Sequence, residues 1–287
     1  MPKKIPRHTT LKKLPVHRAA LRAFTGSASI PAGSSPPAST SIQLLPLTGL
    51  PEINPGDDLA RQIFAIAGRS RIVFENADIL VIAQKIVSKA EGRLTRLTEI
   101  TPSPQAVDLA IKLKKDPRLI EVILRESRRI VRSDPVLIVE THHGFVCANA
   151  GVDQSNILGD NVVSLLPRVP DATARKLAAA LRKLTRKRIA VIISDTFGRP
   201  WRLGLTNVAI GAAGVPALVD LRGTRDLYGK PLHATILAVA DELAAAAGLL
   251  MAKSGGIPAV IIRGYRYRPV LDPAARIIRP ANEDLFR

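Results

Sequence analysis

From Ile42 onward, segments with the apolar spacing of a helix alternate with short, continuous apolar runs. Leu59, Ile63 and Ile66 recur every three or four residues, which is typical of one buried helix face. Two aspartates in the preceding segment, 55–58, favour a helix N-terminus there. Further helices are predicted over residues 105–114, 117–131, 172–184 and 235–251.

The predicted strands are short apolar runs bounded by polar or turn-forming residues. They cover residues 78–83, 136–140, 145–148, 162–166, 189–194 and 258–263. Residues 141–144, which end in a glycine, predict a hairpin turn between the second and third of these strands. Because strands and helices interleave without regular βαβ repeats, we expect an α+β fold rather than a doubly wound sheet.

The first 41 of the 287 residues differ in composition from the rest of the chain. They are basic and then rich in Ser, Pro and Ala, with too little apolar periodicity to form a core. We therefore predict a disordered extension over 1–41 and one compact unit over 42–287. The sequence has no apolar segment followed by a cleavage site, so we expect no secretion signal. It has no long uncharged apolar run, so we expect no membrane-spanning helix.

Composition limits the classes of partner and compartment. The single cysteine, Cys147, excludes an internal disulfide and a cysteine-rich zinc site, and it favours a reducing, cytoplasmic location. The net charge of +18 favours anionic partners, either nucleic acid or small phosphorylated and carboxylated substrates. Only 3% of the residues are aromatic, which argues against single-strand binding, where bases need stacking platforms.

Residues 192–202 (IISDTFGRPWR) carry the most chemical information. An apolar strand is followed at once by Asp195 and Thr196, and then by Arg199 and Arg202. A carboxylate beside a hydroxyl suits a hard cation such as Mg²⁺, and arginines suit phosphate oxygens. The alternative is that Asp195 and Thr196 only cap the next element, and residues 192–202 alone do not decide between the two.

Three other segments could take part in the same chemistry. In residues 149–156 (NAGVDQSN), Asp153 and Asn156 offer oxygen ligands for Mg²⁺ or Mn²⁺, although an ordinary Asx-rich turn has the same composition. Lys85 and Lys89 follow an apolar strand and could neutralise phosphate, or could lie on a solvated face. Glycines in 251–258 could let backbone N–H groups approach an anion, or could simply end a helix. Neither of the common Gly-rich phosphate-binding motifs occurs in the sequence.

Taken together and in order, these segments resemble the coenzyme F420-0:γ-glutamyl ligases. The resemblance covers residues from about 44 to 263, and its specificity comes from the ordered set rather than from any one motif. The segments that carry it are 49–53 (GLPEI), 56–60 (GDDLA), 88–93 (SKAEGR), 149–156, 195–199 (DTFGR), 209–211 (AIG), 226–229 (DLYG) and 240–244 (ADELA).

The resemblance implies a GTP-dependent ligase that adds L-glutamate to the deazaflavin precursor coenzyme F420-0 and extends its γ-glutamyl tail. The reaction would pass through an acyl phosphate and release GDP and phosphate. Mg²⁺ or Mn²⁺, often with K⁺, would serve as cofactor, and the fold would be a two-lobed α+β unit in an intertwined homodimer. A paralogous ligase acting on another carboxylate, and a basic nucleic-acid-binding protein, are the alternatives.

Carried onto matching positions, the resemblance also implies site residues. Asp153, Asp195 and Thr196 would be the metal ligands, and Asp153, Asp195 and Lys89 would act in catalysis. The GTP site would comprise Leu50, Pro51, Glu52, Ile53, Gln84, Lys85, Lys89, Asn156, Met251, Ala252, Lys253, Ser254, Gly255, Gly256 and Ile257. Lys253 stands where some relatives have an acidic or amide metal ligand; a protonated lysine cannot bind a cation but could face a phosphate.

Overall fold

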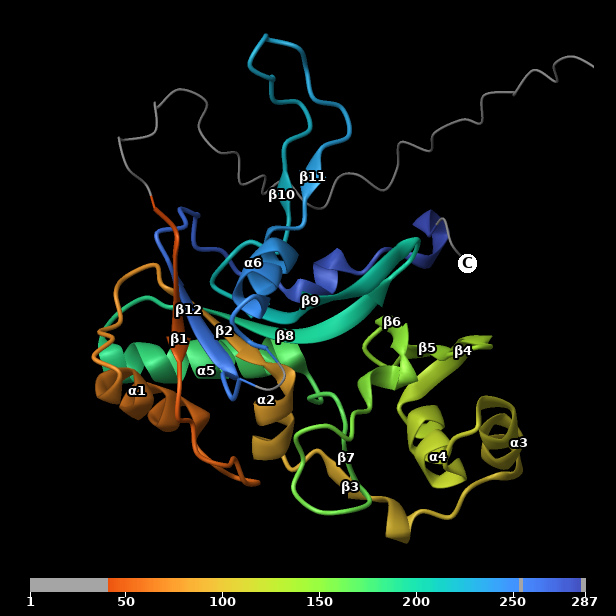
Figure 1. Ribbon diagram of the computed structural model, residues 1–287. Coiled ribbons are helices and arrows are strands. Elements are labelled where there is room, and N and C mark those ends of the chain that lie inside the picture. The colour runs from red at the N-terminus through yellow and green to blue at the C-terminus, as the bar shows by residue number, and fades with distance from the viewer. Residues whose placement is uncertain (1–40, 253–254, 285–287) are drawn as a thin grey trace, which may run out of the picture.

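The computed structural model describes residues 41–252 and 255–284. Within these ranges, five strands form the central sheet in the order β1-β12-β2-β8-β9 (Figure 1). Their bounds are Gln43–Leu47 for β1, Ala259–Arg263 for β12, Ile79–Ala83 for β2, Ala190–Arg199 for β8 and Arg202–Ala213 for β9. Only β2 and β8 run parallel, and the other neighbours are antiparallel. The expected α+β class is confirmed.

Helices cover both faces of this sheet. Helices α1 (Leu59–Arg69) and α5 (Pro170–Thr185) lie on one face, and α6 (Val239–Gly248) lies on the other (Figure 1). Along β2, Leu80 and Ile82 belong to the core on the α1–α5 side, whereas Ile79 and Val81 belong to the core under α6. Successive side chains of a strand point to opposite faces, so a strand covered on both sides must be apolar throughout.

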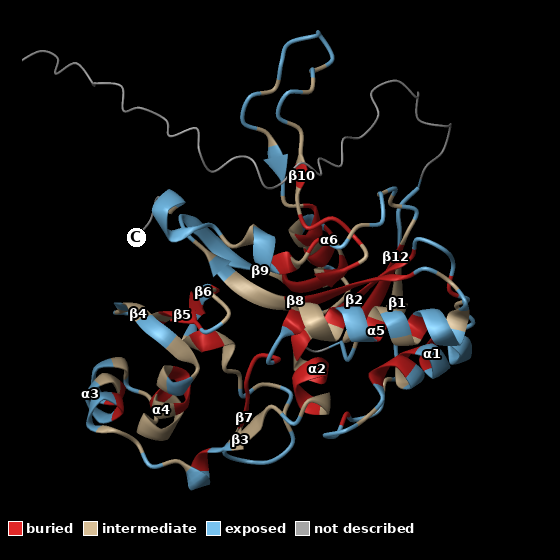
Figure 2. Ribbon diagram, turned by 180° about the vertical axis from the view of Figure 1, so that it is seen from behind, coloured by how far each residue is buried: buried red, intermediate tan, exposed pale blue. Residues whose placement is uncertain are grey.

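A second group of elements packs around its own apolar cluster, which includes Ile120, Ile123 and Leu137. This group contains α3 (Pro104–Leu113), α4 (Pro117–Arg125) and the three-stranded sheet β4 (Ser127–Ser133), β5 (Leu137–Thr141) and β6 (Val146–Ala148). Figure 2 shows their buried faces turned toward one another. The short strands β3 (Leu94–Arg96) and β7 (Val162–Ser164) pair beneath helix α2 (Gln84–Ala90).

Strand register brings four distant segments to one edge of the central sheet. The parallel pairing of β2 with β8 sets Ala83 beside Ser194, so β2 ends at this edge while β8 continues past it to Arg199. Strand β12 is antiparallel to β2 and begins here, with Ala259 beside Ile82 and beside Leu47 at the end of β1. The segments that follow β1 and β2, and the segment that precedes β12, therefore converge beside the middle of β8.

Most of the sequence-predicted elements are present, but three predictions were wrong in their limits. The helix predicted over 117–131 ends at Arg125, because residues 127–133 pair with β5 as strand β4. The helix predicted over 235–251 spans only Val239–Gly248, because Ile236–Leu237 pair as β11 with β10 (Val219–Asp220). The strand predicted to stop at residue 194 continues to Arg199 as one arm of a hairpin with β9.

Three predictions from composition concern the N-terminal extension, membrane-spanning segments and Cys147. Almost all of the extension predicted over 1–41 lies outside the described residues. Within the described ranges, no helix combines the length and apolar character needed to cross a membrane. Cys147 is buried, as expected for a small core residue, and burial together with the negative charge of Asp195 raises the pKa of its thiol to about 12.

Candidate functional site

A cavity of about 440 Å³ lies at the sheet edge where these segments converge. It is bordered by the segment after β1, the start of α2, the loop 153–156, the middle of the β8–β9 hairpin and the segment before β12. Its described lining comprises Leu50, Pro51, Glu52, Ile53, Ala83, Gln84, Lys85, Ile86, Lys89, Asp153, Ser155, Asn156, Ser194, Asp195, Thr196, Asn207, Met251, Ala252, Gly256, Ile257 and Pro258.

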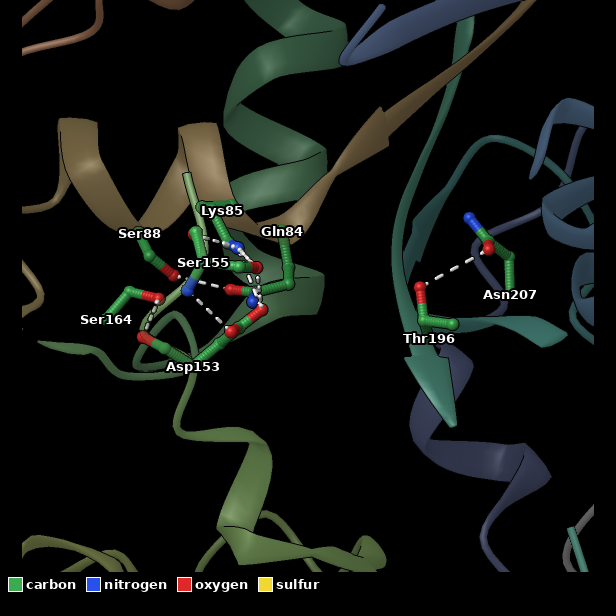
Figure 3. A network of polar contacts seen from close by, with 8 residues as sticks. All are labelled: Gln84, Lys85, Ser88, Asp153, Ser155, Ser164, Thr196 and Asn207. Carbon is green, nitrogen blue, oxygen red and sulfur yellow. Dashed lines mark hydrogen bonds and ion pairs between the residues drawn. The ribbon is translucent and has the colours of Figure 1, made fainter. Parts of the chain in front are cut away.

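Lys85 and Asp153 form the polar centre of one wall. The Lys85 Nζ lies 2.8 Å from Asp153 Oδ2 and donates hydrogen bonds to the Ser155 hydroxyl and carbonyl oxygens. Asp153 also accepts from the Ser155 backbone N–H, at 2.8 Å from Oδ1, and from the Ser155 hydroxyl at 2.9 Å (Figure 3). The carboxylate is therefore held in place by its neighbours while it borders the cavity.

The charge state of Asp153 follows from the same contacts. Burial by itself would raise its pKa, but the hydrogen bonds from Lys85 and Ser155 and the Lys85 charge outweigh burial and lower the pKa. Asp153 is therefore ionised throughout the neutral range. An ionised carboxylate beside an ammonium group is suited to holding a cation and a phosphate at adjacent positions.

The turn at 149–151, which precedes Asp153, has a left-handed backbone conformation. Asn149, Ala150 and Gly151 all have positive φ angles, and Ala150 is buried in this left-handed conformation. A Cβ on Gly151 would lie 2.7 Å from the Leu166 side chain, so only glycine fits there without a shift. Strained residues in succession persist where the surrounding structure determines them, and they are frequent at functional sites.

Lys89 lies one helical turn after Lys85 on α2 and faces the segment that follows β1. Its Nζ is 2.5 Å from Glu52 Oε1, and its side chain is only 8% exposed. Residues four apart lie on one face of a helix, so α2 presents two ammonium groups to the cavity. Each of them is paired with a carboxylate from a different loop.

The opposite wall comes from the β8–β9 hairpin. Thr196 pairs in register with Asn207, and its hydroxyl lies 3.4 Å from Asn207 Oδ1 (Figure 3). A register shift between Ile193 and Ser194 interrupts the ladder just before Asp195. Gly248 on α6 leaves room for Asn207, since a Cβ there would lie 2.8 Å from Asn207 Cγ.

The donor set around the cavity is compatible with a hard divalent cation. The carboxylates of Asp153 and Asp195, the Thr196 hydroxyl and the Asn207 amide oxygen line it. Among the described residues, no group of three or more His, Cys, Asp and Glu side chains could hold a metal by itself. Mg²⁺ typically takes one or two protein carboxylates and completes its shell with water and substrate phosphate oxygens, so the residues present fit it.

The structure brings most of the predicted site residues together. All of those predicted from 50–53, 84–89 and 153–156, together with Asp195, Thr196, Met251, Ala252, Gly256 and Ile257, line this one cavity. Gly255 is not in the lining, and Lys253 and Ser254 lie outside the described residues. Arg199 and Arg202 do not line it; Arg199 instead donates to the Leu203 carbonyl within the hairpin.

Sequence reasoning missed Ser155, Ser194 and Asn207. Ser155 and Ser194 lie within 149–156 and 192–202, whose polar residues next to an apolar strand already indicate a site. Asn207 carried no such signal, because it is recognised only once β9 is known to pair with β8 in this register.

The fold and the cavity define an α+β protein whose polar site combines two lysines with oxygen ligands. Its sequence matches the model of the F420-0:gamma-glutamyl ligase family over residues 49–264, and the chain belongs to this family. It is 48% identical to the coenzyme F420:L-glutamate ligase of Methanothermobacter thermautotrophicus, over 86% of this chain and 99% of the relative. It is 50% identical to that of Methanopyrus kandleri (82% and 94%) and 44% identical to that of Archaeoglobus fulgidus (86% and 96%).

Proposed function

We propose that this protein is a GTP-dependent ligase of the cytoplasm that joins L-glutamate to coenzyme F420-0 and extends the γ-glutamyl tail. The observation that carries the proposal is the cavity itself, in which Lys85, Lys89, Asp153, Asp195 and Thr196 meet in a chain of the F420-0:gamma-glutamyl ligase family. The relatives that span nearly the same length are named for ligation of glutamate to coenzyme F420.

The two lysines support a triphosphate in this cavity. Both ammonium groups are held by carboxylates, so their positions are fixed before a ligand arrives. Phosphoryl transfer needs mainly positioning and charge neutralisation, and these preorganised groups can provide both. The backbone of 251–252 and 256–257 would close the nucleotide site from the side of β12.

A divalent cation, Mg²⁺ or Mn²⁺, together with K⁺, would supply positive charge to the phosphate oxygens. Asp153, Asp195 and Thr196 would hold it, with Asn207 as a neighbouring oxygen donor. Lys85 and Lys89 would hold the γ-phosphate next to the acceptor carboxylate, and Asp153 and Asp195 would keep the cation beside it.

The chemistry would proceed in two transfers. The acceptor carboxylate oxygen attacks the γ-phosphorus and GDP leaves with the electron pair of the broken P–O bond. The glutamate nitrogen then attacks the acyl carbon; a C–N bond forms, the C–O bond to phosphate breaks, and phosphate leaves with that electron pair while the amine releases a proton. Lys85 and Lys89 would neutralise the phosphate charge in both transfers.

The purified protein, supplied with GTP, Mn²⁺, L-glutamate and coenzyme F420-0, is expected to release GDP and to lengthen the acceptor by glutamate. Chromatography measures the GDP, and mass spectrometry measures the added glutamate. If neither product forms, the proposal is wrong; GDP release with another carboxylate acceptor instead would identify the paralogous activity.

We further propose that the two-lobed unit works as an intertwined homodimer. Two projecting hairpins expose large apolar side chains: Leu203 is 99% exposed on the β8–β9 hairpin, and Leu227 is 92% exposed on the loop between β10 and β11. Light scattering after size exclusion should give twice the chain mass of 30.9 kDa. The double variant Leu203→Glu, Leu227→Glu should give the single mass, whereas a wild-type protein at the single mass would contradict the dimer.

A further inference from the structure

A second cavity of about 540 Å³ adjoins the main one. Lys115, Asp116, Leu119 and Ile123 border it on the α3–α4 side, and Asn149 with Val152–Ser155 border it on the other. Asp153 and Ser155 line both cavities, so the two cavities meet at the loop that carries Asp153. A ligand in the second cavity would thus lie next to the group that faces the proposed phosphate site.

Lys115 is the feature of this cavity that points to a ligand. Of the described residues that line it, only Lys115 is a cation, and its Nζ donates to the Asn149 side-chain oxygen at 3.0 Å. Unlike Lys85 and Lys89, it has no carboxylate among the described residues within ion-pair distance. An ammonium group has three donors, so Lys115 can bind an incoming carboxylate without giving up Asn149.

The position of Lys115 is fixed by the ends of two helices. Its backbone N–H donates to the Ala110 carbonyl at 3.0 Å, which closes the C-terminus of α3 after the left-handed residue Lys114. The next residue, Asp116, caps α4 and is bound at both carboxylate oxygens by Arg118. The backbone that carries Lys115 is therefore fixed by the hydrogen bonds that end α3 and begin α4.

The rest of the lining suits a small, charged, non-aromatic ligand. Leu119, Ile123 and Val152 provide aliphatic surface, and no aromatic side chain is among the described lining residues. A deazaflavin ring would favour an aromatic platform, and a phosphodiester would favour more than one cation. An amino acid with an aliphatic stem and a carboxylate matches this lining, because Lys115 can bind the carboxylate and the aliphatic side chains can contact the stem.

We propose that this second cavity binds L-glutamate, with Lys115 holding one of its carboxylates and the amine directed toward Asp153 and Ser155, where the two cavities meet. This inference rests on the proposed ligase function. It assigns the amine-bearing substrate to the α3–α4 side of Asp153, so that the nucleotide and the amino acid approach the reacting carbonyl from the two adjoining cavities.

The test uses Lys115→Met, which keeps the aliphatic stem, and Lys115→Arg, which keeps the charge. Lys112→Met is the matched control, since Lys112 lies on α3, is exposed and lines neither cavity. With the full chain, Lys115→Met is expected to raise the KM for glutamate about 10- to 100-fold, as for loss of a charge-assisted hydrogen bond. The Kd for GTP should stay within about twofold, Lys115→Arg should recover part of the loss, and Lys112→Met should match the wild type.

Three results would overturn the inference: an unchanged KM for glutamate, a parallel loss of GTP affinity, or a rise in the KM for the acceptor instead. A parallel loss of GTP affinity would mean that Lys115 acts only by holding the 149–153 turn.

Calorimetric titration with L-glutamate separates this inference from the proposed function. If the wild type releases no GDP, the ligase proposal fails, but glutamate binding that is lost in Lys115→Met still supports the site; no glutamate binding to the wild type rejects it.

Discussion

Replacing Asp153 with asparagine is expected to lower kcat by about 10²- to 10³-fold, the range found when one preorganised electrostatic group is removed from an active site. Asparagine keeps a carbonyl oxygen for Ser155 but removes the charge that pairs with Lys85 and that would hold the cation. The Lys85 ammonium would then lie partly buried without its carboxylate, next to the proposed phosphate position. GDP release under saturating substrates measures this effect.

Asp160→Asn is the control for this experiment. Asp160 follows in the same connection between β6 and β7 but is exposed and does not line the cavity. It should retain wild-type turnover, and both variants should keep the wild-type circular dichroism spectrum. Full activity in Asp153→Asn would remove this residue from the metal and phosphate site.

Replacing Gly211 with alanine is expected to cost about 3 kcal/mol of unfolding free energy, near the upper end for overpacking a core. A Cβ at this position would lie 2.6 Å from the Pro170 carbonyl carbon and 2.7 Å from its oxygen. These are backbone atoms at the start of α5, so the clash can be relieved only by moving the helix away from β9. Urea denaturation measures the loss.

Gly68→Ala is the matched comparison, because Gly68 lies in α1 and a Cβ there would meet nothing within 4 Å. That variant should gain about 0.5–1 kcal/mol from the better helix propensity of alanine. Equal denaturation midpoints for the Gly211 variant and the wild type would show that α5 adjusts without cost.

Much of the fold could be predicted from local patterns. The continuous apolar run of β2 correctly indicated a buried strand, and the aspartates before Leu59 correctly indicated a helix start, since Asp58 caps α1. Predictions failed where a segment takes its form from a distant partner. The arm of β8 beyond Ser194 is polar, and it is a strand because β9 pairs with it.

By itself, the sequence determined the α+β class, most elements and the short segments from which the main cavity is built, because apolar periodicity and loop composition are local properties. Only the tertiary structure decided how these segments meet. Strand register sets Ala83 beside Ser194 and Thr196 opposite Asn207, and it brings the loop before β12 to the same edge. The cavity beside Lys115 likewise exists only because the end of α3 packs against the turn at Asn149. Such contacts join residues far apart in the chain, and no local pattern records them.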